Sequence, residues 1–139
     1  ILKILGIDYG DARTGLSVSD PTGLIAGSPS VIAEWNRDKL LEKLTAYIRD
    51  NRIETIVLGY PKNMDGSVGA RAEKCAALAE DLKARTGVPV VLWDERRTTV
   101  EAHQILREAG KKTKKHKKNV DAVAATLILQ GYLDAQRLR

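Results

Sequence analysis

The chain has 139 residues, of which 43% are hydrophobic and 29% are charged, a balance typical of globular proteins rather than disordered ones. This length fits a single domain over residues 1–139 with one hydrophobic core. No apolar run approaches the roughly 20 residues that a membrane span needs. Cys75 is the only cysteine, which excludes a disulfide framework and a thiolate zinc cluster, and we expect it to be a packed helix residue. These features predict a cytoplasmic protein that does not enter a membrane.

The net charge of +5 is concentrated in one short lysine tract. Its members are Lys111, Lys112, Lys114, Lys115, Lys117 and Lys118. Without these lysines the chain has a net charge of −1, so the basicity is local. Such a tract is typical of a phosphate-binding loop and equally of a solvated surface loop. Aromatic residues are not interleaved with it, which favours contact with a nucleic-acid backbone over base stacking. Trp35 and Trp93 are expected in the core or at an interface.

The first part of the chain predicts three short strands. Residues 1–8 are apolar on both pleat faces apart from Lys3, which indicates a central strand covered on two sides. Turn residues around Gly10 and at 20–23 separate it from two further strands, expected at 14–19 and 30–33. We expect these three strands to form an antiparallel meander.

The rest of the chain alternates helical and extended patterns. The expected elements are a helix at 38–51, a strand at 55–58, a helix at 70–86, a strand at 90–93, a helix at 98–109 and a final helix from Asn119 to about 136. The element order is therefore βββαβαβαα. Strands that alternate with helices pair in parallel through right-handed crossovers. The prediction is an α/β fold with a mixed five-stranded sheet and helices on both faces.

Acidic residues follow the ends of two of these strands. Asp8 ends the first strand, and Asp94 and Glu95 end the fifth. Ligands of open α/β sheets gather beyond the carboxyl ends of parallel strands. Asp8 follows a buried run, and an unpaired buried carboxylate costs several kcal/mol. A divalent cation could compensate for it, and so could an arginine or a set of backbone amides. The candidate arginines in the sequence are Arg13, Arg96 and Arg97.

Asp121 is the third acid, expected in the first turn of the last helix. There the helix macrodipole alone could stabilise it, by about 0.3–1 kcal/mol. Helical spacing nevertheless places Ala124, Ala125 and Ile128 beside it, on the face that packs against the sheet. Three acids from distant segments suit Mg²⁺ or Mn²⁺, and two such ions about 4 Å apart could promote phosphodiester hydrolysis. Glu95 reaches further than Asp94, but both remain candidates for the second ligand.

Four blocks of the sequence, in order along the chain, resemble the YqgF/RuvX family. They are GIDYGDARTGLSVSD at Gly6–Asp20, GYPKNMDGS at Gly59–Ser67, DERRTTVEA at Asp94–Ala102 and VDAVAATLILQGYLD at Val120–Asp134. This family is similar to the RuvC Holliday-junction resolvases of the RNase H-like superfamily. The resemblance implies the βββαβαβαα layout, an acidic metal site and one of two activities. These are nuclease processing of the 5′ end of the small-subunit (16S) ribosomal RNA precursor, and Holliday-junction resolution.

The family's catalytic acids correspond to Asp8, Glu95 (with Asp94 beside it) and Asp121. Arg97 departs from the leucine that is usual in the family and could contact phosphate or pair with Asp94. In the loop after the fourth strand, Lys62 and Asn63 are candidate substrate contacts, although the loop could also be a flexible surface segment. The lysine tract leads directly into Asp121, so a polyanion bound there would lie near the acids.

Two further interpretations remain beside the nuclease. A non-catalytic ribosome-assembly factor would use the same basic tract to bind nucleic acid, with the acids as structural pairs. An ATPase of the actin and sugar-kinase type carries a similar motif after its first strand, but it usually needs two lobes. Expected partners are structured RNA or branched DNA, including the small-subunit precursor. Monomer and homodimer both remain open, since a resolvase needs a symmetric dimer.

Overall fold

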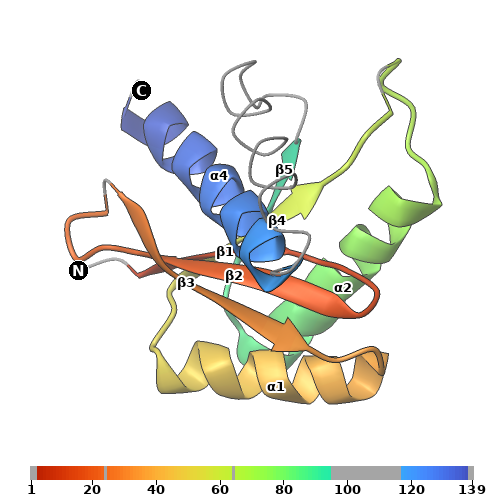
Figure 1. The fold of residues 1–139 in the computed structure, drawn as a ribbon, viewed down its shortest axis with the longest axis horizontal. Coiled ribbons are helices and arrows are strands. Elements are labelled where there is room, and N and C mark those ends of the chain that lie inside the picture. The colour runs from red at the N-terminus through yellow and green to blue at the C-terminus, as the bar shows by residue number, and fades with distance from the viewer. Residues whose placement is uncertain (1–2, 24, 64, 95–116, 138–139) are drawn as a thin grey trace.

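A computed structural model describes residues 3–23, 25–63, 65–94 and 117–137, and it contains one five-stranded sheet flanked by helices (Figure 1). The strands are β1 (Ile4–Asp8), β2 (Arg13–Ser19), β3 (Ala26–Ala33), β4 (Thr55–Tyr60) and β5 (Val90–Asp94). The helices are α1 (Arg37–Asp50), α2 (Ala70–Thr86) and α4 (Lys117–Arg137). The predicted helix at 98–109 lies outside the described residues. None of the described helices is long and apolar enough to cross a membrane.

The strand order is β3-β2-β1-β4-β5. The β1–β2 and β2–β3 pairs are antiparallel, whereas β1–β4 and β4–β5 are parallel. This confirms the predicted meander followed by parallel strands. β3 is longer than predicted and begins at Ala26, because the hydroxyl of Ser17 donates to the Gly27 carbonyl at 2.7 Å and a register shift between Leu16 and Val18 extends the pairing.

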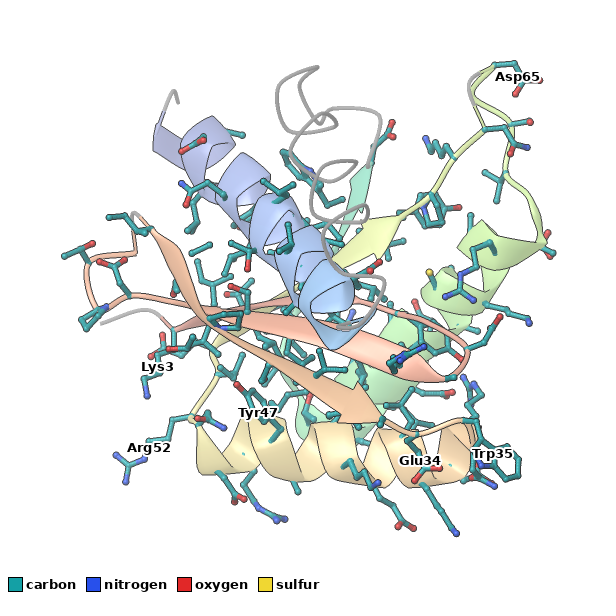
Figure 2. All side chains as sticks on the ribbon, in the orientation of Figure 1. Lys3, Glu34, Trp35, Tyr47, Arg52 and Asp65 are labelled. Atoms are coloured by element: carbon teal, nitrogen blue, oxygen red, sulfur yellow. The ribbon has the colours of Figure 1, made fainter. Side chains whose placement is uncertain are left out.

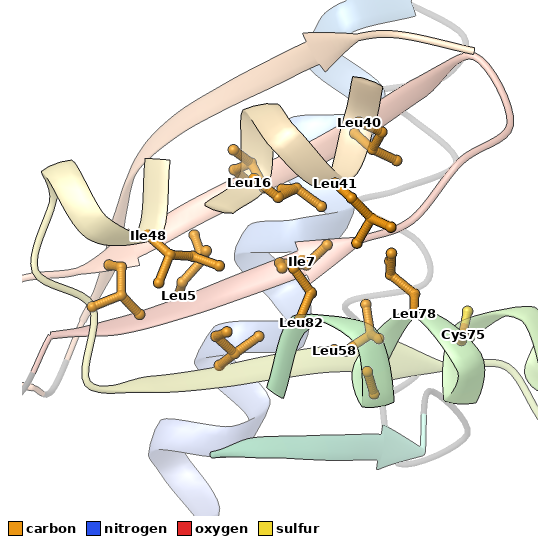
Figure 3. Close-up of a cluster of buried hydrophobic side chains, with 14 of the residues drawn as sticks. Leu5, Ile7, Leu16, Leu40, Leu41, Ile48, Leu58, Cys75, Leu78 and Leu82 are labelled. Atoms are coloured by element: carbon orange, nitrogen blue, oxygen red, sulfur yellow. The ribbon is translucent and has the colours of Figure 1, made fainter. Parts of the chain in front are cut away.

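The larger core lies between the sheet and helices α1 and α2. Figure 3 shows how leucine and isoleucine side chains from the strands meet those of both helices. Leu5 and Ile7 of β1 contribute from the sheet, and both are fully buried. Cys75 of α2 is 2% exposed in this cluster, which confirms that it is a packed helix residue. The alternating residues of β1 therefore point toward α1 and α2.

The second core lies on the opposite face of the sheet, beneath α4. It joins Ile4 and Val57 of the sheet to Ile128, Leu129 and Leu133 of the helix. Trp93 of β5 also belongs to it and packs edge-on against Tyr132, with ring centroids 6.0 Å apart. The predicted cover of helices on both faces is confirmed, and Figure 1 shows α4 alone on its side of the sheet among the described helices.

One buried hydroxyl on β2 makes no hydrogen bond within the described structure. Thr14 has no exposed surface, and its Oγ1 has no partner. An unsatisfied buried polar group costs about 1–3 kcal/mol. Thr14→Val keeps the side-chain shape and removes this cost, so it should raise the free energy of unfolding by about 1 kcal/mol.

Urea denaturation of the Thr14→Val variant measures this effect. The matched control is Thr45→Val, because the Thr45 hydroxyl donates to the Leu41 carbonyl at 2.6 Å and its loss should bring no gain. A Thr14→Val protein that unfolds at a lower urea concentration than the parent would show that the hydroxyl contributes to the fold.

Candidate active site

The parallel strands β1, β4 and β5 end at one edge of the sheet, here called the carboxyl edge. Asp8 ends β1, and Asp94 ends β5. β4 lies between these two strands and ends in Tyr60, so no acid separates them. The two predicted acidic strand ends thus share the carboxyl edge, although their strands are not neighbours.

The pleat of β1 assigns Asp8 to the face that α4 covers. Gly6 lies directly under α4, since a Cβ built on it would be 2.7 Å from Leu129 Cβ and 2.9 Å from the Ala125 carbonyl oxygen. Ile7 points the other way, into the core with α1 and α2. Successive residues of a strand alternate between faces. Asp8 therefore lies on the α4 face, where it is half-buried.

The packing of α4 on Gly6 also indicates where position 121 lies, which is beyond Gly6 toward the carboxyl edge. The later part of α4 lies near the opposite edge, because the Gln130 side chain accepts a hydrogen bond from the Ala26 amide at 2.9 Å. Residue 121 is one helical turn before Ala125, a step of about 6 Å. Asp8 is two strand residues beyond Gly6, a step of about 7 Å in the same direction. The backbone thus brings position 121 to the level of Asp8.

The start of α4 differs from the prediction. The described helix begins at Lys117, two residues before the predicted cap at Asn119, and its first turn contains no acid. The prediction that Asp121 lies in the first turn is therefore wrong. Because the influence of the macrodipole falls off within the first turn, the helix end no longer accounts for an acid at this position.

β5 presents Asp94 on the opposite face from Asp8. Asp94 pairs with Tyr60, and Tyr60 packs against the core beneath α1 and α2. Trp93, one residue earlier, belongs to the α4 core. Asp94 therefore shares a sheet edge with Asp8 without sharing its face.

Several predicted site residues lie outside the described residues. They are Glu95, Arg96, Arg97, Lys111, Lys112, Lys114 and Lys115. Lys117 and Lys118 form the first turn of α4, but their side chains and that of Asp121 are not described. Among the side chains that the structure describes, no three of the His, Cys, Asp and Glu type gather in one place. Glu95 and Asp121, which belong to the predicted set of acids, are not among the described side chains.

The remaining predicted contacts lie at the carboxyl edge. Arg13 begins β2, half-buried beside the turn that follows Asp8. Lys62 follows β4, with its ammonium 5.9 Å from the centre of the Tyr60 ring. Asn63 belongs to a turn closed by its own hydrogen bonds: its side-chain amide donates to Ser67 Oγ at 2.9 Å, and the Ser67 amide donates to Asp65 at 2.8 Å.

Arg71, in the first turn of α2, is a site residue that the sequence analysis missed. Its guanidinium donates to the Asp11 carboxylate at 2.8 Å and also to the Tyr9 carbonyl, and it lies 5.1 Å from the centre of the Tyr9 ring. Asp8, Gly10 and Arg71 line the same hollow of about 230 Å³. One signal was available in the sequence: a cation in a first helical turn opposes the macrodipole, so its presence there indicates another partner.

Arg71 fixes the turn that follows Asp8. Replacing it with alanine releases Tyr9 and Asp11 from α2, so we expect catalytic activity at this edge to fall about tenfold through loss of alignment. Arg71→Lys should recover little, because an ammonium does not reproduce two hydrogen bonds from one planar group. Initial rates of phosphodiester cleavage measure both variants. Full activity in Arg71→Ala would show that the turn holds its shape without this contact.

Comparison with known proteins gives consistent results. The family RuvX, described as Holliday junction resolvase, matches residues 2–135. A relative from Halothermothrix orenii is 44% identical over 135 residues, covering 97% of this chain and 96% of that protein. Another from Acetivibrio thermocellus is 43% identical over 138 residues, covering 97% of each. Both are named "Putative pre-16S rRNA nuclease".

Solved structures share the fold at low sequence identity. Thermus thermophilus RuvC, in complex with a Holliday junction substrate, matches with a TM-score of 0.64 at 14% identity, covering 98% of this chain and 97% of RuvC. The Fowlpox virus resolvase bound to Holliday junction DNA matches with a TM-score of 0.62 at 10% identity, covering 97% and 99%. These likenesses confirm the RNase H-like fold. The family match over nearly the whole length and the relatives above 40% identity lead to one conclusion: the chain belongs to the RuvX family.

Proposed function

We propose that this protein is a metal-dependent nuclease that processes the precursor of 16S ribosomal RNA in the cytoplasm. The observation that carries the proposal is the close packing of α4 on Gly6, which brings position 121 level with Asp8 on one face of the carboxyl edge. The names of the relatives from Halothermothrix orenii and Acetivibrio thermocellus support the choice of substrate.

The proposed metal ligands are Asp8, Glu95 and Asp121. Their carboxylate oxygens suit Mg²⁺ or Mn²⁺, hard cations that prefer oxygen ligands. When bound, two such ions would activate a water molecule and stabilise the leaving oxygen of a phosphodiester. Asp8, half-buried at the end of a rigid central strand, fixes the geometry of the set.

The pleat of β5 argues against Asp94, the last residue of that strand, as the second ligand. Asp94 lies on the face of α1 and α2, whereas Trp93 lies on the face of α4. Asp8 lies on the α4 face, so the sheet separates the Asp94 side chain from it. We therefore propose Glu95 as the catalytic acid and Asp94 as its neighbour outside the metal site.

The basic residues near this edge are proposed to bind the phosphate backbone. They are Arg13, Lys62, Arg96, Arg97 and the lysine tract, with Asn63 as a neutral contact. Phosphate contacts release counterions, so affinity should fall steeply as the salt concentration rises. The position of Lys117 and Lys118 in the first turn of α4, just before Asp121, supports this assignment.

A second candidate substrate is branched DNA, because the family that matches the chain is described as Holliday junction resolvase. The deciding experiment offers the purified protein a precursor rRNA fragment and a four-way DNA junction side by side, each with magnesium and with manganese. We expect metal-dependent cleavage of the RNA fragment. Cleavage of the junction alone would assign the protein to DNA, and tight, salt-dependent binding without any cleavage would identify a non-catalytic assembly factor.

A further inference from the structure

Trp35 is the most exposed large apolar side chain among the described residues. Its exposed fraction is 80%, and it lies between the end of β3 and the start of α1. Figure 2 shows its ring projecting from the molecule near the N-terminal end of α1. Trp35 is therefore not a core residue, and of the two expected places only an interface remains for it. Trp93, which is 6% exposed, lies in the core as predicted. An exposed indole forgoes a large gain from burial.

The residue before Trp35 is firmly anchored. The Glu34 amide donates to the Ala12 carbonyl at 3.0 Å. Its carboxylate accepts from the Lys43 ammonium at 2.9 Å and from the Asn36 amide at 3.1 Å. The hydrogen bond from Lys43, followed by that from the Asn36 amide, lowers the pKa of Glu34 below its usual value. Glu34 therefore stays charged and keeps its contacts near neutral pH.

The residue after Trp35 is fixed as well. Asn36 caps α1, with its side-chain oxygen accepting from the Lys39 amide at 3.0 Å. The backbone is thus tied to Ala12, the residue before β2, on one side of Trp35 and to α1 on the other. Such anchoring fixes the backbone that carries the indole, which limits the conformational freedom lost when a ligand binds.

Trp35 also lies at the carboxyl edge, beyond the end of β3 and next to α1, whereas Asp8 ends β1 on the α4 face. β3 runs parallel to β1, because each is antiparallel to β2. Val31 pairs with Gly15, which pairs with Asp8, so one row crosses the three strands. Trp35 comes four residues after Val31, so it lies about 10 Å to the side of β1 and up to about 13 Å further along the strand direction. Substrate that extends sideways from Asp8 would reach it within a few nucleotides.

We propose that Trp35 is a stacking platform for an unpaired base of the nucleic-acid substrate. The inference rests on the proposed function for the identity of the ligand. Every base has a π-face that can stack on an indole, so such a contact tolerates any sequence. Arg13, whose backbone pairs with Ala33 two residues before Trp35, lies at the same corner and suits the adjoining phosphates.

A nucleobase fits this position better than a protein surface does. A stable protein interface buries about 800 Å² on each partner, which requires a broad patch. The other exposed large apolar residues of the described chain are Ile25, Val68 and Leu92. Ile25 precedes β3 at the opposite end of the sheet, and Leu92 is on β5 at the far side. Trp35 is therefore separate from Ile25 and Leu92, and Val68 alone would not give it a patch of that size.

Intrinsic fluorescence tests the proposal directly, because Trp35 is exposed and Trp93 is buried. The intact protein is titrated with a short single-stranded RNA in the presence of EDTA, so that binding occurs without metal. We expect saturable quenching of the exposed tryptophan. Trp35→Phe should lose the quenching signal while it keeps most of the affinity, and Trp35→Ala should bind about tenfold more weakly. Leu92→Ala, another exposed apolar change, is the matched control and should bind like the parent.

Unquenched Trp35 fluorescence with RNA bound, or equal affinity in Trp35→Ala, would overturn the inference. Tryptophan emission that changes with protein concentration in the absence of RNA would also overturn the inference, because it would show that Trp35 contacts a second copy of this chain. A cleavage assay on the same proteins separates this inference from the proposed function. If Trp35→Ala cleaves like the parent and RNA does not quench Trp35, the stacking role of Trp35 is contradicted and the nuclease activity stands. If RNA quenches Trp35 but no metal supports cleavage, the nuclease activity is contradicted and the stacking role of Trp35 stands.

Discussion

Asp8→Asn is expected to abolish magnesium-dependent cleavage, with a rate at least about 100-fold below that of the parent. The amide keeps the size of the side chain but removes the negative charge that would hold the cation. Metal ions supply several kcal/mol of transition-state stabilisation, and each 1.36 kcal/mol is a tenfold change in rate. Initial rates on the precursor rRNA fragment, at saturating magnesium, measure the loss.

The fold should survive this substitution, because Asp8 is at the end of its strand and only half-buried. Circular dichroism and the thermal midpoint of unfolding check that it does. Asp50→Asn is the matched control, since Asp50 ends α1 with its side chain 69% exposed. Asp50→Asn should cleave like the parent. An Asp8→Asn protein that cleaves at the parent's rate would remove Asp8 from the catalytic site.

Gly6→Ala is expected to reduce both stability and activity. The added methyl group would meet Leu129 Cβ at 2.7 Å and the Ala125 carbonyl oxygen at 2.9 Å. Neither atom is the far end of a flexible side chain, so α4 must move away from the sheet. Overpacking of this kind costs about 1–3 kcal/mol. The same movement displaces position 121 from Asp8, so cleavage should fall about 100-fold, as expected when catalytic groups shift by about 1 Å.

Urea denaturation and cleavage rates at a temperature where the variant is still folded separate the two effects. Gly27→Ala is the control within the same sheet, because a Cβ on Gly27 would lie 3.8 Å from its nearest neighbour, the Val18 carbonyl oxygen. It should cleave at the parent's rate. A Gly6→Ala protein with unchanged stability and rate would show that α4 does not pack as closely as described.

The sequence predicted most of the fold because its hydrophobic patterns are strong. The apolar run of β1 predicted a central strand, and the helical stripe of α2 predicted the observed bounds of 70–86. The start of β3 was missed because Gly27, Ser28 and Pro29 are residues typical of a turn. In the structure Gly27 pairs with Val18 and Ser30 with Leu16, and the strand continues through an irregularity between these two pairs. The start of α4 was missed because lysines carry no apolar periodicity.

The candidate site was predictable only where strand ends determine it. The position of Asp8 was predictable because it ends a buried strand. That its side chain lies on the α4 face could be known only from the packing of Gly6 against α4. The face of the sheet on which Asp94 lies likewise depends on the register between β5 and β4. Arg71 reaches Asp11 across 60 positions of the chain, and the exposure of Trp35 depends on tertiary packing. No local pattern reports such long-range geometry.

Binding of Mn²⁺, followed by electron paramagnetic resonance in the absence of nucleic acid, tests the central claim most directly, because it reports the metal site apart from substrate. The parent protein should remove free Mn²⁺ from solution in a saturable manner. Asp8→Asn should lose this binding, and Asp50→Asn should retain it. Saturable binding of equal strength in the parent and in Asp8→Asn would contradict a metal site built on Asp8.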